Sequence, residues 1–166
     1  MTTRLITRSA LIAAIYFILT IVLQPLSFGP IQFRISEIMT LLPVLMPESI
    51  IGLTVGCLIS NIIFSPFGIF DIVFGTLATL VAAILTYFLR RKIILAGLPP
   101  VLLNAFIVPL IFLLSGSDAA TAGYMFNVMT ILIAEAVIVY ILGIPVIYAL
   151  KKVLPLSNIN VTKKPN

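Results

Sequence analysis

Eight polar side chains interrupt the apolar runs of this 166-residue chain, and their types could do chemistry. The charged ones are Arg34, Glu37, Asp71 and Glu135, and the amides are Gln32, Asn61, Asn104 and Asn127. A charged side chain at the centre of a lipid bilayer costs at least about 2.5–3.5 kcal/mol, so each such residue needs a partner or a ligand. Carboxylates and amides accept and donate hydrogen bonds, which predicts binding of a small polar molecule.

Glu135 is the most informative of these residues. It lies deep in an apolar run, at a depth similar to that of Asn104, and no Lys or Arg lies at comparable depth. We therefore expect Glu135 to be neutral or to pair with something brought from outside, which predicts a ligand-binding role.

Structural roles are the alternative for the other polar residues. Arg34 and Glu37 are three residues apart, so they could form a local ion pair. Asp71 follows Ser-Pro-Phe-Gly and could interact with the N-terminus of a helix. Asn61 and Asn104 could hydrogen-bond between helices.

Aromatic side chains gather near the expected outer loops, where anchoring at the membrane interface is their default role. Phe28 and Tyr124 are the two that we expect to stack on a flat heterocyclic ligand.

Several chemistries are excluded or disfavoured. The sequence has no histidine, which removes histidine metal sites and histidine-activated nucleophiles, and we expect no metal and no cofactor. No Gly-x-x-x-x-Gly-Lys-Ser/Thr motif occurs, so the chain has no P-loop for ATP. Its basic residues form short clusters between apolar runs rather than a stripe, which disfavours nucleic acid. An enzyme is therefore disfavoured, and Cys57 is expected to be a buried, inert thiol.

Composition indicates the elements that position these residues. The chain is 61% hydrophobic and 9% charged, with a mean hydropathy of +1.28, whereas a soluble domain carries roughly a quarter charged residues. A spanning helix needs about 20 apolar residues, so we predict one all-α transmembrane domain over residues 1–166, with an uncleaved first span. The six predicted spans cover residues 8–25, 34–46, 48–65, 70–90, 97–115 and 123–150. The second span is short, and the sixth is expected to bend near Gly143 and Pro145.

Charge distribution predicts the orientation of the bundle. With the N-terminus inside, nine of the ten basic residues fall on cytoplasmic segments, and only Arg34 falls on the outer side. These nine are Arg4, Arg8, Arg90, Arg91, Lys92, Lys151, Lys152, Lys163 and Lys164. Both termini are therefore predicted to be cytoplasmic, and the polar candidates converge on the outer half, which indicates a binding pocket open to the outside.

The first span carries two small residues four positions apart, Ala10 and Ala14. Small residues at this spacing let a second helix approach closely. The spacing alone favours a contact within the bundle over a contact with a partner.

Four stretches resemble the queuosine-precursor transporter (QueT) family over about residues 8–152. They are the FGPIQFRISE run at residues 28–37, TLLP at 40–43, SPFG-x-x-DIVFGTLAT at 65–79 and LPPV-x-x-NA at 98–105. The family consists of substrate-specificity (S) components of energy-coupling factor (ECF) transporters of the prokaryotic cell membrane. The resemblance implies a six-helix bundle with cytoplasmic termini and a substrate site near the outer face.

The resemblance also implies partners and a substrate class. The partners are a transmembrane coupling subunit and two cytoplasmic ATPases, and the substrate is a deazaguanine-type base. Members use small residues of the first helix to contact the coupling subunit, so Ala10 and Ala14 become candidates for that interface. The ring N–H and amino groups of such a base suit a carboxylate, and Glu37, Asp71 and Glu135 supply three.

Two other functions stay open at this point. The chain could be an S component for another vitamin or heterocycle, or a stand-alone proton-coupled carrier that uses Glu135 as its proton site. An S component binds its substrate but needs its ATPase module for turnover, whereas a carrier transports alone.

Overall fold

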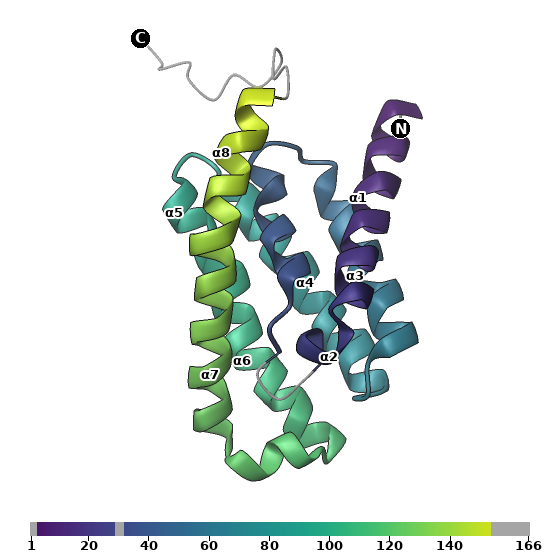
Figure 1. The fold of residues 1–166 in the computed structure, drawn as a ribbon, viewed down its shortest axis with the longest axis vertical. Coiled ribbons are helices and arrows are strands. Elements are labelled where there is room, and N and C mark those ends of the chain that lie inside the picture. The colour runs from purple at the N-terminus through teal and green to yellow at the C-terminus, as the bar shows by residue number, and fades with distance from the viewer. Residues whose placement is uncertain (1–2, 29–31, 154–166) are drawn as a thin grey trace.

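The structure is a computed structural model that describes residues 3–28 and 32–153, and in these ranges the chain folds into helices and loops without strands. Figure 1 shows an elongated bundle whose helices run along its long axis. The predicted all-α class is confirmed. Residues Gly29 and Pro30 of the first loop, and Lys163 and Lys164, lie outside the described residues.

The helical elements follow one another closely along the chain. They are α1 (Thr3–Val22), α2 (Gln24–Ser27), η1 (Ile35–Val44), α3 (Ser49–Phe64), η2 (Asp71–Gly75), α4 (Thr76–Phe88), α5 (Ile93–Ala96), α6 (Leu98–Ser115), η3 (Asp118–Ala122), α7 (Tyr124–Ala136), η4 (Val137–Gly143) and α8 (Ile144–Val153). The start of α1 and the end of α8 lie at the same end of the bundle (Figure 1).

Four helical stretches are long and apolar enough to cross a membrane, namely residues 3–22, 71–88, 93–115 and 124–153. The stretches Ile35–Val44 and Ser49–Phe64 are apolar but shorter, so the count of six spans stays a prediction. Large apolar side chains cover the outer surface, as at Ile18, which is 55% exposed, and Phe106, which is 51% exposed. Such a surface suits lipid rather than water.

Helix α1 packs against α3 through small residues. A Cβ atom added at Gly52 would lie 2.6 Å from the Ser9 carbonyl oxygen, and one added at Gly56 would lie 2.9 Å from the Ala13 carbonyl oxygen. These glycines therefore allow the two backbones to approach closely, as is common where helices associate in lipid.

Three segments depart from regular α-helix. The element η1 is a 3₁₀-helix of 10 residues, although such runs rarely exceed three or four residues. The elements η2 and η4 are π-helical. The last long helix, which was expected to bend near Gly143 and Pro145, contains a π segment, Val137–Gly143, that ends at Gly143; the bend itself stays a prediction. Regular helix resumes at Ile144, just before Pro145.

Candidate functional site

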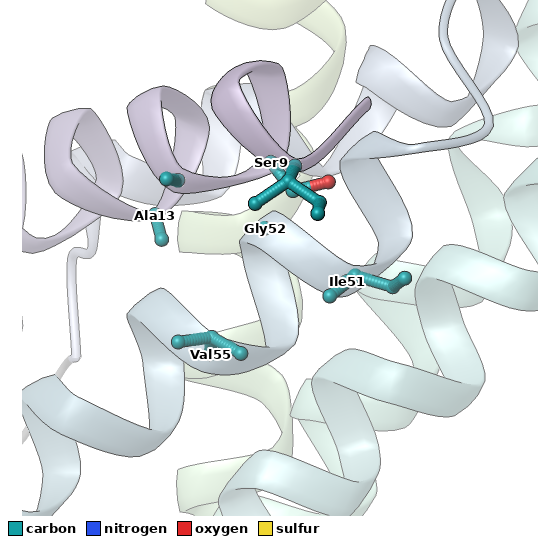
Figure 2. A pocket seen from close by; sticks show the side chains of 7 residues that line it. Ser9, Ala13, Ile51, Gly52 and Val55 are labelled. Atoms are coloured by element: carbon teal, nitrogen blue, oxygen red, sulfur yellow. The ribbon is translucent and has the colours of Figure 1, made fainter. Parts of the chain in front are cut away.

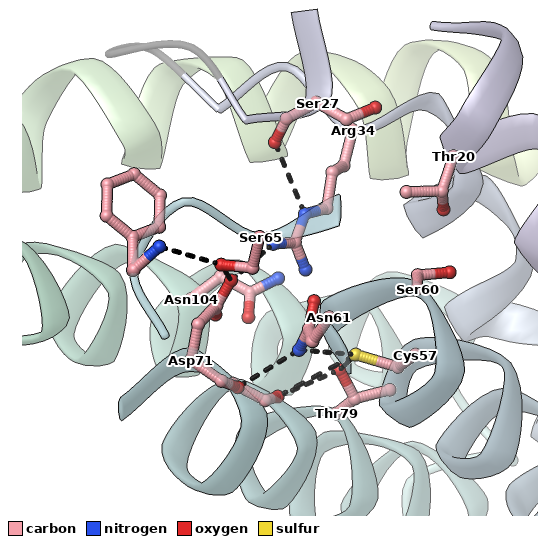
Figure 3. Close-up of polar contacts among 12 residues, drawn as sticks. Thr20, Ser27, Arg34, Cys57, Ser60, Asn61, Ser65, Asp71, Thr79 and Asn104 are labelled. Carbon is pink, nitrogen blue, oxygen red and sulfur yellow. Dashed lines mark hydrogen bonds and ion pairs between the residues drawn. The ribbon is translucent and has the colours of Figure 1, made fainter. Parts of the chain in front are cut away.

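The cluster of polar residues between the helices is built around an ion pair that joins two separate elements. Arg34 Nη2 donates to Asp71 Oδ2 at 3.3 Å, and both side chains are buried. The Ser65 hydroxyl donates to the same carboxylate oxygen at 2.6 Å. Figure 3 shows these side chains converging from the loop before η1 and from the start of η2. The alternative of an Arg34–Glu37 pair is wrong, because the structure pairs Arg34 with Asp71 instead.

The end of α2 contacts the Arg34 guanidinium from a second side. The Nε atom of Arg34 donates to the Ser27 carbonyl oxygen at 3.3 Å, and the Cζ atom of Arg34 lies 4.7 Å from the centroid of the Phe28 ring. A cation over an aromatic face is stabilised by the ring quadrupole. Phe28, expected to stack on a ligand, therefore already stacks on Arg34.

Asn61 fixes the backbone where the π segment begins. Its Nδ2 donates to the Asp71 carbonyl oxygen at 3.0 Å and lies 3.5 Å from Cys57 Sγ, which also accepts from the Thr79 hydroxyl at 3.2 Å (Figure 3). These bonds link α3 to η2 and α4. Asn61 thus hydrogen-bonds between helical elements, which was the structural alternative to a ligand contact. Cys57 is buried as expected.

Two further buried carboxylates are held by uncharged donors. The Tyr16 hydroxyl of α1 donates to Glu37 Oε1 at 2.6 Å, and Asn104 Nδ2 of α6 donates to Glu135 Oε1 at 3.0 Å. These two hydrogen bonds join α1 to η1 and α6 to α7.

Each of the buried carboxylates keeps one oxygen that bonds to nothing in the described part of the chain. These atoms are Oε2 of Glu37, Oδ1 of Asp71 and Oε2 of Glu135. The Gln32 Nε2 and Asn61 Oδ1 atoms are buried without a partner there too. A buried polar atom without a hydrogen bond costs about 1–3 kcal/mol. Such atoms are suited to bind a ligand with several donors and an acceptor.

Gln32 is the predicted site residue with strained backbone. It is 3% exposed and has a φ angle of +52°, a conformation that residues other than glycine rarely adopt. Backbone strain of this kind tends to occur at functional positions.

Two predicted site residues have partners elsewhere in the structure. Asn127 Nδ2 donates to the Ala119 carbonyl oxygen at 2.7 Å and so ties α7 to η3. The Tyr124 hydroxyl donates to the Phe106 carbonyl oxygen at 3.0 Å and so ties α7 to α6. Neither forms a hydrogen bond with the residues around Arg34, Glu37 and Glu135, so a ligand contact for either stays a prediction.

Tyr16 and Ser65 belong to the cluster, but the sequence patterns did not identify them as candidate site residues. The buried face of α1 carries Ser9, Ala13, Tyr16 and Thr20, spaced four, three and four residues apart as one face of a helix requires. That spacing could have identified Tyr16. Ser65 gave no comparable signal, because a serine before a proline is an ordinary turn residue.

A groove lies on the surface of the bundle where the first half of α1 meets the first half of α3. An apolar groove of about 250 Å³ is lined by Ile6, Ser9, Ala10, Ala13, Ile51, Gly52 and Val55 (Figure 2). Ala10 and Ala14 are exposed, whereas Ser9 and Ala13 are buried against α3. The contact within the bundle is therefore made by the neighbouring small residues, which leaves the face of Ala10 and Ala14 uncovered.

No group of metal-binding side chains emerges in the described ranges, 3–28 and 32–153. No three Cys, Asp or Glu side chains there are grouped so that they could hold a metal ion. What the cluster offers is carboxylate, amide, guanidinium and hydroxyl groups for hydrogen bonding.

Fold and site together define a class: an all-α membrane protein with a polar cluster enclosed between its helices. Residues 6–152 match the QueT transporter family, and the chain belongs to that family. A 74-residue stretch is 45% identical to the queuosine precursor transporter QueT of Lactococcus lactis subsp. cremoris (strain MG1363). That stretch covers 43% of this chain and 43% of the relative, less than half the length of either. No solved structure matches the chain.

Proposed function

We propose that this protein is the substrate-binding membrane subunit of an ECF-type importer in the prokaryotic plasma membrane. It takes up a queuosine precursor, a deazaguanine-type base, from outside the cell. Transport is driven by ATP that partner subunits hydrolyse. Family membership supports the transporter class, and the name of the Lactococcus relative, a queuosine precursor transporter, supports the substrate.

The observation that carries the proposal is the set of buried polar atoms without partners. Glu37, Asp71 and Glu135 each keep one free carboxylate oxygen inside an apolar bundle. A deazaguanine edge presents ring N–H and amino donors that such oxygens accept, as acidic side chains do when they bind base edges. The free Nε2 of Gln32 adds a donor for a ring carbonyl.

The uncovered face of α1 supports the partner half of the proposal. Ala10 and Ala14 are exposed, and the groove beside Ala10 is apolar. In lipid, helices associate where small residues permit close approach. A coupling-subunit helix therefore fits this face, on the same helix that carries Tyr16 into the polar cluster.

Identification of a retained ligand tests the proposal directly. The chain is purified in mild detergent from cells supplied with deazaguanine bases, and small molecules released by denaturation are identified by mass spectrometry. A deazaguanine base, bound at one per chain in subsequent calorimetry, is the expected result. Recovery of a different vitamin or heterocycle would support the alternative of an S component with another substrate.

A stand-alone proton-coupled carrier is the second candidate, and the free oxygen of buried Glu135 is the observation that favours it. Reconstitution distinguishes the two functions. In proteoliposomes the chain alone should bind the base without accumulating it, and uptake should require the coupling subunit, the ATPases and ATP. Uptake by the chain alone, driven by a proton gradient and abolished in Glu135→Gln, would establish the carrier instead.

A further inference from the structure

The turn between α4 and α5 carries three consecutive cations, Arg90, Arg91 and Lys92. All five acidic residues of the sequence lie in the described ranges, and the two ion pairs formed there involve other basic residues. None of the three cations therefore pairs with an acidic side chain. A basic run at a helix end is by itself only an orientation signal, but this one has further features that suit a ligand.

An open cavity of about 450 Å³ lies at this turn and is lined by Tyr87, Phe88, Arg90 and Arg91. The Cζ atom of Arg90 lies 4.3 Å from the centroid of the Tyr87 ring, so the guanidinium stacks on an aromatic face. The Tyr87 and Phe88 rings meet edge to face, with centroids 5.9 Å apart. Stacking restrains the guanidinium plane and leaves the N–H groups at its edge for hydrogen bonding. Such an edge binds two oxygens of one phosphate in bidentate fashion.

Hydrogen bonds order the backbone of this turn. The Arg90 N–H donates to the Tyr87 carbonyl oxygen at 3.3 Å, and the Lys92 N–H donates to the Leu89 carbonyl oxygen at 3.0 Å. A turn that is already ordered loses less conformational entropy on binding than a loose basic segment does. The cavity is therefore preorganised for an anion.

The position of the turn indicates which anion reaches it. The turn connects residues 71–88 and 93–115, two helical stretches that are long and apolar enough to cross a membrane. It therefore lies where the hydrocarbon core gives way to lipid headgroups. Apolar side chains flank the cations, since Phe88 is 72% exposed and Ile94 is 67% exposed. A soluble anion would use the guanidinium groups alone, whereas a phospholipid also places its acyl chains on these apolar side chains.

We propose that the cavity at the α4–α5 turn binds the phosphate headgroup of an acidic phospholipid. Arg90, held on the Tyr87 ring, donates to the phosphate oxygens, Arg91 adds a second positive charge, and exposed Phe88 contacts the acyl chains. Basic pockets at the ends of transmembrane helices bind acidic headgroups in this way. The site is separate from the polar cluster around Arg34, and the inference does not depend on the substrate.

Competition between two lipids with the same acyl chains tests this site. The full chain in mild detergent is mixed with equal amounts of dioleoyl phosphatidylglycerol and dioleoyl phosphatidylcholine, and bound lipid is measured by native mass spectrometry. The choline cation balances the phosphate charge in phosphatidylcholine, so a difference between the lipids reports the charge of the headgroup. We expect one tightly bound phosphatidylglycerol per chain, preferred about 10-fold, as a hydrogen bond to a charged group provides.

Paired variants separate the cavity from net charge. The double variant Arg90→Gln/Arg91→Gln should abolish the preference. Its matched control is Lys151→Gln/Lys152→Gln, which removes the same charge from exposed positions in the last turn of α8, at the same end of the bundle, and should keep the preference (Figure 1). Arg90→Lys/Arg91→Lys keeps the charge without the planar fork and should keep only part of the preference.

Tyr87 tests the aromatic part of the site without a change of charge. Tyr87→Leu removes the ring on which Arg90 stacks and should lower the preference for phosphatidylglycerol, whereas Tyr87→Phe keeps the ring and should retain it. Thermal unfolding in detergent without added lipid checks that each variant is folded.

Three results would overturn the proposal. Equal binding of both lipids by the wild type would remove the site, and loss of the preference in Lys151→Gln/Lys152→Gln as well would assign it to net charge. Displacement of phosphatidylglycerol by inorganic phosphate would reassign the cavity to a soluble anion. If Arg90→Gln/Arg91→Gln keeps the lipid preference but no longer co-purifies with the coupling subunit and ATPases, the turn contacts a protein partner instead. Binding of the base is measured separately, so this inference and the proposed function fail independently.

Discussion

At the scale of single residues, what distinguishes this bundle is where its unpartnered polar atoms lie. Hydrogen bonds within a helix satisfy its backbone polar groups. In lipid, the polar atoms that remain without a hydrogen bond are therefore mainly those of side chains. In the described ranges the buried acids of the cluster each make a bond with one oxygen and leave the other free. The bonded oxygen fixes the rotamer of the side chain, and the free oxygen is held in position for a ligand.

Glu135→Gln tests this division of roles between the two oxygens. The amide keeps the shape of the side chain but replaces one acceptor with a donor that opposes a ligand N–H. We expect substrate binding to weaken by about 1–3 kcal/mol, measured by calorimetry with the precursor base. The variant Asp118→Asn is the matched control, because Asp118 is exposed in η3 and its neutralisation should not affect affinity. Unchanged affinity with a large fall in the unfolding temperature of Glu135→Gln would assign Glu135 to structure.

Gly75 controls the position of Asp71 through its lack of a side chain. A Cβ atom at this position would collide with Asp71 Oδ1 and approach Asn61 Nδ2 at 3.1 Å. We expect Gly75→Ala to displace the Asp71 carboxylate and to destabilise the protein by about 1–3 kcal/mol, as overpacking usually does.

Thermal unfolding of the purified variant measures this effect. Gly143→Ala is the control, because Gly143 also ends a π segment but its nearest neighbour is the flexible end of Leu41, at 3.1 Å. Equal stability of the two variants would show that the Asp71 carboxylate can move without cost and that Gly75 does not constrain its position.

At the scale of elements, the acids coincide with irregular helix. Glu37 lies in the 3₁₀ segment η1, Asp71 opens the π segment η2, and Glu135 lies two residues before the π segment η4. Such departures from α-helix change which side chains share a face, and they are frequent at functional sites. Each of the three carboxylates therefore lies in or beside an irregular segment.

This irregularity also explains which features could be predicted from the sequence. Hydropathy places apolar helices because each must satisfy its backbone in lipid, and the burial of Arg34, Glu37, Asp71 and Glu135 follows from the cost of exposing charge to lipid. The Arg34–Asp71 pair could not be predicted, because Arg34 lies in extended backbone just before the 3₁₀-helix that holds Glu37, where regular helical spacing does not apply. Long-range partners such as Tyr16 depend on how helices pack, which spacing within one helix does not determine.

Helix α1 offers a test in which two adjacent faces should respond differently. Ala10 is exposed and lines the apolar groove, so Ala10→Trp, and likewise Ala14→Trp, should leave the isolated chain folded with near wild-type substrate affinity. Because a bulky side chain keeps a partner helix at a distance, co-purification with the coupling subunit and ATP-dependent uptake should be lost.

Ala13→Trp is the matched control for this prediction. Ala13 is 8% exposed and packs where a Cβ atom on Gly56 would lie 2.9 Å from its carbonyl oxygen. This variant should therefore lose stability and substrate binding in the isolated chain. If Ala10→Trp and Ala14→Trp lose binding in the same way, the small residues serve internal packing and the partner face lies elsewhere.

At the scale of the whole molecule, the two ends of the bundle differ in charge and in content. The end that holds the start of α1 and the end of α8 (Figure 1) also holds the loop between α4 and α5. Arg4 and Arg8 lie in the first half of α1, and the Arg90–Lys92 cluster lies in that loop. At this end Arg8 also bonds to Glu48 at 3.0 Å. The loops that position the Arg34–Asp71 pair lie toward the opposite end. A ligand from outside reaches these loops directly only if the basic end faces the cytoplasm.

Cysteine labelling tests this orientation. The single native cysteine is buried Cys57, so new cysteines are introduced one at a time in a Cys57→Ser background. We expect Arg91→Cys and Lys152→Cys to react with a membrane-impermeant maleimide only after the membrane is opened, since basic segments stay inside. Ser117→Cys, in the loop between α6 and η3, should react in intact cells. Labelling of Ser117→Cys from the cytoplasmic side alone would invert the bundle and place the loops around Arg34 and Asp71 inside the cell, where they could not receive a substrate from outside.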